Sequence, residues 1–99
     1  MVIEDTILIE LVHYLKETFE ISGIYLFGSA LNGNFTDESD IDIALFIKDY
    51  EKYSMKDFAK AFFYVQNNIG SRFELHFFSD NIIPLTFPDY VRNSGKKVA

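Results

Sequence analysis

Two aspartates separated by one residue, Asp40 and Asp42, are the residues whose spacing most directly indicates chemistry. They open a segment in which apolar side chains recur at every second position, as in a β-strand. This period of two places both carboxylates on one face, with their Cα atoms roughly 6.5–7 Å apart. Carboxylates converging on one point repel each other by about 4 kcal/mol at 4 Å and an effective dielectric constant near 20. Mg²⁺ or Mn²⁺ would remove that cost, and the alternative is a strand with an acidic solvent face.

A glycine–serine pair, Gly28-Ser29, follows a short apolar run at residues 24–27 that predicts a buried strand. Gly28 allows the backbone to approach a ligand closely. The amides after it would point outward at the start of a helical turn, where they favour a phosphate, and Ser29 adds a hydroxyl donor. The alternative interpretation is an ordinary turn.

A third carboxylate, Glu74, lies in a later alternating segment, residues 72–78. Glu74 and His76 share the polar face of this predicted strand. We interpret His76 as a surface residue in preference to one that orients a carboxylate or contacts a substrate. Three carboxylates and a phosphate-binding turn are the components of a site for two-metal phosphoryl or nucleotidyl transfer.

The remaining patterns predict the elements that must position these residues. Helical spacing of apolar side chains predicts helices over residues 3–19, capped by Asp5 or Thr6, and over 55–69, capped by Ser54. Strands are expected at 24–27, 41–47 and 72–78, a loop at 32–39, and a short last helix from Tyr90. This order predicts an α+β fold in one domain, residues 1–99, with a small mixed β-sheet and two helices packed on one face.

The composition excludes several classes of protein. The 99 residues include no cysteine, which excludes disulfides, thiolate zinc sites and cysteine nucleophiles. A net charge of -6 argues against a stand-alone nucleic-acid binder. No apolar run reaches the roughly 18 residues of a membrane span and no leader pattern is present, so we expect a cytoplasmic protein. Aromatic residues make up 17% of the chain, more than a small core readily buries, which predicts an apolar partner surface.

The segment from Gly28-Ser29 to Ser39-Asp40-Ile41-Asp42 and Leu45 resembles the signature of the nucleotidyltransferase superfamily typified by DNA polymerase β. Its minimal, MNT-type branch is the most similar. The motif covers residues 24–45, and weaker resemblance extends over nearly the whole chain, including the closing segment 91–98. The resemblance implies the polymerase β-like fold.

The resemblance also implies roles for the residues named above. Gly28 and Ser29 would hold the triphosphate of an NTP, with ATP the expected donor. Asp40, Asp42 and Glu74 would be the catalytic residues and the ligands of Mg²⁺ or Mn²⁺. Glu74 stands where the family often has a third aspartate, which binds the catalytic metal and helps to activate the acceptor hydroxyl. That hydroxyl would attack the α-phosphate, so that an NMP is transferred and pyrophosphate is released.

Two departures from the family pattern bear on activity. Leu31-Asn32 stands where the family often has an arginine, and Glu74 carries one methylene more than aspartate. A misplacement of about 1 Å can lower a rate about 10²-fold. The alternative to an active enzyme is therefore a weak or inactive interaction subunit that neutralises a partner by binding. A less favoured alternative is transfer to a small molecule such as an aminoglycoside.

The acceptor is expected to come from another chain, because 99 residues leave little room for an acceptor-recognition domain. The resemblance implies a small helical partner of the HEPN type, in a toxin–antitoxin module where this chain is the antitoxin that nucleotidylates its partner. A homo-oligomer is the alternative use of an apolar surface.

Overall fold

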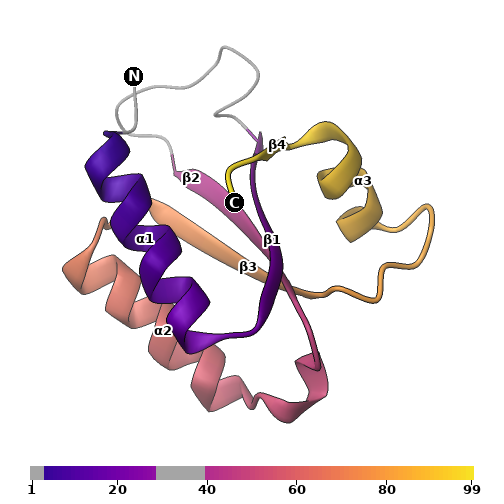
Figure 1. The fold of residues 1–99 in the computed structure, drawn as a ribbon, viewed down its shortest axis with the longest axis horizontal. Coiled ribbons are helices and arrows are strands. Elements are labelled where there is room, and N and C mark those ends of the chain that lie inside the picture. Colours follow the sequence, from indigo (N-terminus) through magenta and orange to yellow (C-terminus); the bar gives the residue numbers. More distant parts are fainter. Residues whose placement is uncertain (1–3, 29–39) are drawn as a thin grey trace.

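The computed structural model describes residues 4–28 and 40–99, and Figure 1 shows their arrangement. Its regular elements follow the predicted order, with two short additions after β2 and after α3. They are α1 (Asp5–Thr18), β1 (Ile21–Phe27), β2 (Ile41–Ile47), the 3₁₀ turn η2 (Tyr50–Lys52), α2 (Met55–Asn68), β3 (Phe73–Ser79), α3 (Phe87–Ser94) and β4 (Lys96–Lys97).

The sheet has four strands in the order β3-β2-β1-β4. β1 is antiparallel to both β2 and β4, whereas β2 and β3 are parallel. Parallel neighbours need a crossover connection, which α2 supplies between β2 and β3. The expected mixed sheet is therefore confirmed.

One face of the sheet is covered by α1 and α2 (Figure 1). The apolar positions of β2 alternate as predicted, so that Ile43 and Leu45 meet Leu11 and Leu15 of α1 and Val65 of α2. All five side chains are fully buried. Burying one such side chain contributes about 1.5–3 kcal/mol, so this cluster is the main stabilising core.

The other face carries a smaller cluster of Ala44, Phe46 and Val91. Val91 belongs to α3, which covers part of this face. The prediction of helices on one face is thus confirmed for α1 and α2, and α3 is an additional element on the opposite face. It begins at Phe87 and not at Tyr90, because Pro88 occupies the first turn, where its missing N–H leaves no hydrogen bond unmade.

Several predicted boundaries shift in the structure. β1 begins at Ile21, because Ser22 and Gly23, interpreted as a break, lie inside the strand at a register irregularity. Neither Asp5 nor Thr6 caps α1; the cap position is Glu4, whose side chain makes no capping bond.

The predicted cap of α2 is confirmed. Ser54 Oγ accepts a hydrogen bond from the Asp57 amide at 3.2 Å, and the Ser54 amide donates to Asp57 Oδ2 at 2.8 Å. This reciprocal pair satisfies two amides that the first turn otherwise leaves unpaired. No helix within residues 4–28 and 40–99 is both long and apolar enough to cross a membrane.

Candidate functional site

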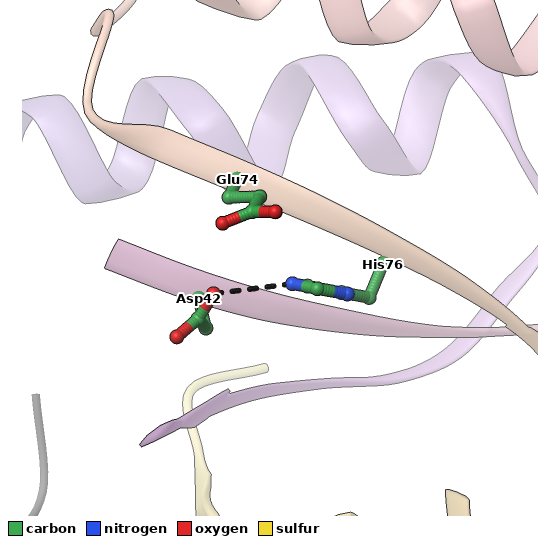
Figure 2. A group of neighbouring side chains, drawn as sticks. All are labelled: Asp42, Glu74 and His76. Atoms are coloured by element: carbon green, nitrogen blue, oxygen red, sulfur yellow. Dashed lines mark hydrogen bonds and ion pairs between the residues drawn. The ribbon is translucent and has the colours of Figure 1, made fainter. Parts of the chain in front are cut away.

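The carboxylates Asp42 and Glu74 lie side by side on the sheet face that α1 and α2 leave uncovered (Figure 2). Asp42 is the second residue of β2 and Glu74 the second residue of β3. Parallel pairing places them in direct register, and alternation turns both to the side of Ala44 and Phe46. Their proximity is therefore a consequence of the β2–β3 register.

His76 joins this pair as its third member. One ligand atom from each of Asp42, Glu74 and His76 lies within 4.8 Å of the others. His76 Nε2 is 3.1 Å from Asp42 Oδ1, at hydrogen-bond distance, and Figure 2 shows the ring directed at that carboxylate. Its register partner is Ala44, whose small side chain leaves room for the ring to lean along the sheet. The Asp42 and His76 side chains are 22% and 30% exposed, so the group is half-buried but reachable from solvent.

The ring of His76 also packs against an aromatic side chain of β1. Phe27, the last residue of β1, packs against His76 at a ring-centroid distance of 5.0 Å and an interplanar angle of 66°. Phe27 in turn contacts Phe87 of α3 at 5.9 Å. Edge contacts of this kind favour one ring orientation, so both the hydrogen bond and the packing direct His76 at Asp42.

Gly28 passes directly against the same carboxylate. Its φ of +76° lies in the left-handed region that favours glycine. A Cβ at this position would lie 2.4 Å from Asp42 Oδ2 and 3.3 Å from its Cγ. The Gly28 backbone therefore lies close to Asp42, and the expected approach of a phosphate to Gly28 stays a prediction. Ser29 and Asn32, to which sequence analysis also gave weight, lie outside the described residues.

Asp40 is the one proposed metal ligand that stands apart. It is exposed, immediately before β2, and it does not belong to the group formed by Asp42, Glu74 and His76. Sequence analysis interpreted His76 as a surface residue, whereas the structure places it beside Asp42. The signal that would have found it is its shared face with Glu74, combined with a parallel β2–β3 register.

The donor set of this group fits a divalent cation. Two carboxylates and an imidazole are ordinary metal ligands, and bonds of about 2.1 Å separate opposite ligand atoms by about 4.2 Å. One ligand atom from each of the three residues lies within 4.8 Å of the other two. Small side-chain movements would therefore allow Asp42, Glu74 and His76 to hold one ion.

A cleft of about 660 Å³ lies elsewhere, between α1, η2 and α2, and does not include the carboxylate group. It is bordered by Lys52, whose hydrogen bond to Glu20 lowers the pKa of that carboxyl and raises the pKa of the lysine. Tyr14 and Tyr64 also line it, and their rings stack on each other with their centroids 4.2 Å apart.

Comparison with known proteins gives one family and one fold. The family model of the polymerase β nucleotidyltransferases matches residues 10–99. No curated protein matches the chain. A crystal structure described as a "putative nucleotidyltransferase" from Sulfolobus solfataricus is similar, with a TM-score of 0.57 and 24% sequence identity.

That similarity covers 76% of this chain and 66% of the other, so the chain spans just under two thirds of the length of that structure. At this identity the likeness shows the fold. The superfamily indicated by the sequence motif is confirmed, and the MNT branch stays a prediction. Because the family model covers nearly all of the sequence, the chain belongs to the polymerase β nucleotidyltransferase family.

Proposed function

We propose that this chain transfers an NMP from an NTP, with ATP the expected donor, to an acceptor hydroxyl in a metal-dependent reaction. The observation that supports it most is the register of Asp42 with Glu74, which brings two carboxylates together beside the Gly28 backbone. In a chain of the nucleotidyltransferase family, this is the part of the fold that carries the Gly-Ser and Asp-x-Asp motif.

Each residue has a role in this proposal. Asp42 and Glu74 hold Mg²⁺ or Mn²⁺, and Asp40 adds a ligand from the residue before β2. The ion supplies positive charge to the α-phosphate and to the leaving pyrophosphate. Gly28 and Ser29 bind the phosphates through their backbone and hydroxyl groups. Glu74 accepts the proton of the acceptor hydroxyl as its oxygen bonds to the α-phosphorus and the bond to pyrophosphate breaks.

The acceptor in this proposal is a protein, and the support comes from the surface around α3. Large apolar side chains are exposed in the connection from β3 to α3 and on α3 itself; they are Ile83, Leu85, Phe87 and Tyr90. We call these four residues the α3 patch. Phe87 contacts Phe27, which packs on His76, so the patch is continuous with the carboxylate group. A partner docked on it would lie next to the site.

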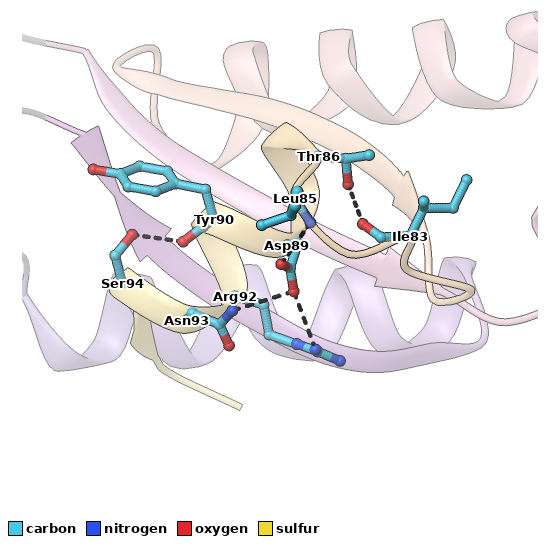
Figure 3. A network of polar contacts seen from close by, with 8 residues as sticks. All are labelled: Ile83, Leu85, Thr86, Asp89, Tyr90, Arg92, Asn93 and Ser94. Atoms are coloured by element: carbon cyan, nitrogen blue, oxygen red, sulfur yellow. Dashed lines mark hydrogen bonds and ion pairs between the residues drawn. The ribbon is translucent and has the colours of Figure 1, made fainter.

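The backbone under this patch holds Leu85 outward. Leu85 is 98% exposed and has a φ of +66°, a conformation that costs a non-glycine residue about 1–2 kcal/mol. Figure 3 shows the contacts that maintain it: Asp89 Oδ2 accepts a hydrogen bond from the Leu85 amide at 3.0 Å, and Asp89 Oδ1 accepts from Asn93 at 3.2 Å. A strained residue that presents a large apolar side chain to solvent favours recognition by a partner.

We further propose that this partner is a helical protein of the HEPN type and that the chain acts as its antitoxin, as in MNT modules. A second copy of this chain is the alternative occupant of the α3 patch. Introduction of a charge in this patch, Leu85→Asp, is expected to abolish the partner complex and to leave self-association unchanged if the partner is the occupant.

The second candidate function is a subunit that neutralises its partner by binding alone. Glu74 favours it, because its extra methylene displaces the carboxylate oxygens from the position an aspartate would give them. One experiment separates the two functions. The purified chain is incubated with the product of the neighbouring gene, Mg²⁺ or Mn²⁺ and α-³²P-labelled NTPs.

Label transfer to the partner, absent with Asp42→Asn, would support the enzyme. A tight complex that acquires no label with either metal would refute the transferase and leave the binding function. An exposed substitution on α1, Ile9→Ser, serves as a control that is expected to change neither labelling nor binding.

A further inference from the structure

His76 is positioned to interact with the carboxylates through a ring nitrogen, and it does more than cover the sheet surface. Its Nε2 faces Asp42 Oδ1 at 3.1 Å, and it is two residues from Glu74 on the same face of β3. Phe27 packs on the ring, so the nitrogen remains directed at the carboxylates. The arrangement brings one nitrogen and one oxygen from each of two carboxylates within 4.8 Å of one another.

The distance between His76 Nε2 and Asp42 Oδ1 fits a metal ion bound to both atoms as well as it fits a hydrogen bond between them. Two ligand atoms bound at about 2.1 Å and at a right angle are about 3.0 Å apart. The Nε2···Oδ1 separation of 3.1 Å is close to this value. An ion can therefore replace the hydrogen-bond proton between His76 and Asp42 while both side chains stay nearly in place.

An imidazole ligand changes which ion such a site prefers. Mg²⁺ favours oxygen ligands, whereas imidazole suits first-row transition-metal ions, whose affinities rise from Mn²⁺ to Co²⁺. We propose that His76 is a direct ligand of the divalent ion, together with Asp42 and Glu74, and that it makes this site select a transition-metal ion over Mg²⁺. The inference rests on the proposed function, in that the ion is the one the transfer reaction uses.

The chain offers a matched control for this proposal. It has two histidines, and the other, His13, lies on α1, where its side chain is 71% exposed and contacts Glu17 at 3.2 Å. His13 is also a histidine beside a carboxylate, but among residues 4–28 and 40–99 it belongs to no group of three side chains that could hold a metal ion. Its replacement tests the loss of a histidine without the loss of the site.

The experiment measures metal binding directly. Mn²⁺, Co²⁺ and Mg²⁺ are titrated by calorimetry into the wild-type chain and into His76→Ala, His76→Gln and His13→Ala. His76→Ala is expected to weaken Mn²⁺ and Co²⁺ binding at least tenfold and Mg²⁺ binding less than threefold, while His13→Ala changes neither. His76→Gln keeps a hydrogen-bonding group but offers an oxygen, so it is expected to lose the preference for Co²⁺ and Mn²⁺ over Mg²⁺. A His76→Gln variant that retains the preference would refute ligation.

A second measurement uses the wild-type chain alone and so does not depend on how the variants fold. In long-range ¹H–¹⁵N spectra of the two imidazoles, substoichiometric Mn²⁺ is expected to broaden the His76 signals and to leave those of His13 sharp. Binding that depends on Asp42 but leaves the His76 signals sharp would overturn the inference and leave the proposed function standing. Absence of any Mn²⁺ or Mg²⁺ binding, with or without a non-hydrolysable ATP analogue, would refute both.

Discussion

The close approach of Gly28 to Asp42 gives a prediction that joins backbone conformation to the site. In Gly28→Ala, the new Cβ would lie 2.4 Å from Asp42 Oδ2, a distance below the 3.0 Å at which real Cβ contacts begin. Rotation of the carboxylate relieves this only in part, because the Cγ and Cβ of Asp42 are already at 3.3 and 3.5 Å. Either the carboxylate or the backbone after β1 must therefore move.

The substitution is expected to affect both the stability of the fold and the function of the site, and the two effects differ in size and in how they are measured. A left-handed φ costs alanine about 1–2 kcal/mol relative to glycine, so the free energy of unfolding is expected to fall by about that amount. A functional group must stay within about 0.5 Å of its productive position, and a shift of about 1 Å lowers a rate about 10²-fold. Metal affinity and turnover are thus expected to fall about 10-fold to 10²-fold, beyond what lost stability explains.

Gly23→Ala is the matched control, because Gly23 lies within β1, the strand that Gly28 directly follows. There the added Cβ would meet the Tyr25 ring at 3.0 Å, and φ is not positive. It is expected to leave Mn²⁺ affinity unchanged. Urea unfolding and calorimetric Mn²⁺ titration measure both effects. The reasoning would be refuted if Gly28→Ala bound Mn²⁺ as tightly as the wild type, or if Gly23→Ala lost as much affinity.

Three further changes test the site and the surface. Asp42→Asn is expected to weaken Mn²⁺-dependent NTP binding more than about 10²-fold, since loss of a ligand should exceed the 10–100-fold effect of outer partners; retained binding in calorimetry would contradict its role. Glu74→Gln is expected to lower turnover about 10²-fold or more, with a smaller effect on nucleotide affinity; the reverse pattern in steady-state kinetics would make Glu74 a ground-state ligand only. Lys52→Met is expected to return the pKa of Glu20 upward toward 4.5, as read by NMR titration of the carboxyl. The stabilising Glu20–Lys52 pair is present above pH 4.5 and is lost as the pH falls through the lowered pKa, so a wild-type Glu20 that titrates at 4.5 would show that the pair does not form in solution.

The local part of the fold was predictable from local patterns. Alternation at residues 41–47 identified β2 and its buried face, because one side of the strand packs on α1 and α2. Ser54 was recognised as a cap since a serine before an apolar helical pattern satisfies the first-turn amides. The start of β1 was missed because Ser22 and Gly23 are usual turn formers, and only pairing with β2 holds them in a strand.

The assembly of the site was harder to predict from the sequence, because it depends on contacts between segments distant in sequence. Each strand's own alternation places Asp42 on one face of β2 and Glu74 on one face of β3, but no local pattern states their mutual register. That register is defined only by the pairing of β2 with β3, which α2 connects. His76 was undervalued for the same reason: its neighbour Asp42 is supplied by another strand.

The substitution of glutamate for the family's third aspartate takes on a different meaning beside His76. Taken alone, the longer Glu74 side chain weakens an all-oxygen site, because it displaces a carboxylate by about one carbon–carbon bond. In the structure, Glu74 nonetheless keeps an oxygen within 4.8 Å of both Asp42 and His76. His76 is the third member of this group, and exposed Asp40 does not belong to it. With His76 as a ligand, the proposed site combines carboxylate oxygens with one nitrogen. The departure at Glu74 would then accompany a change in ligand type, and we expect an active enzyme that uses Mn²⁺ in preference to Mg²⁺.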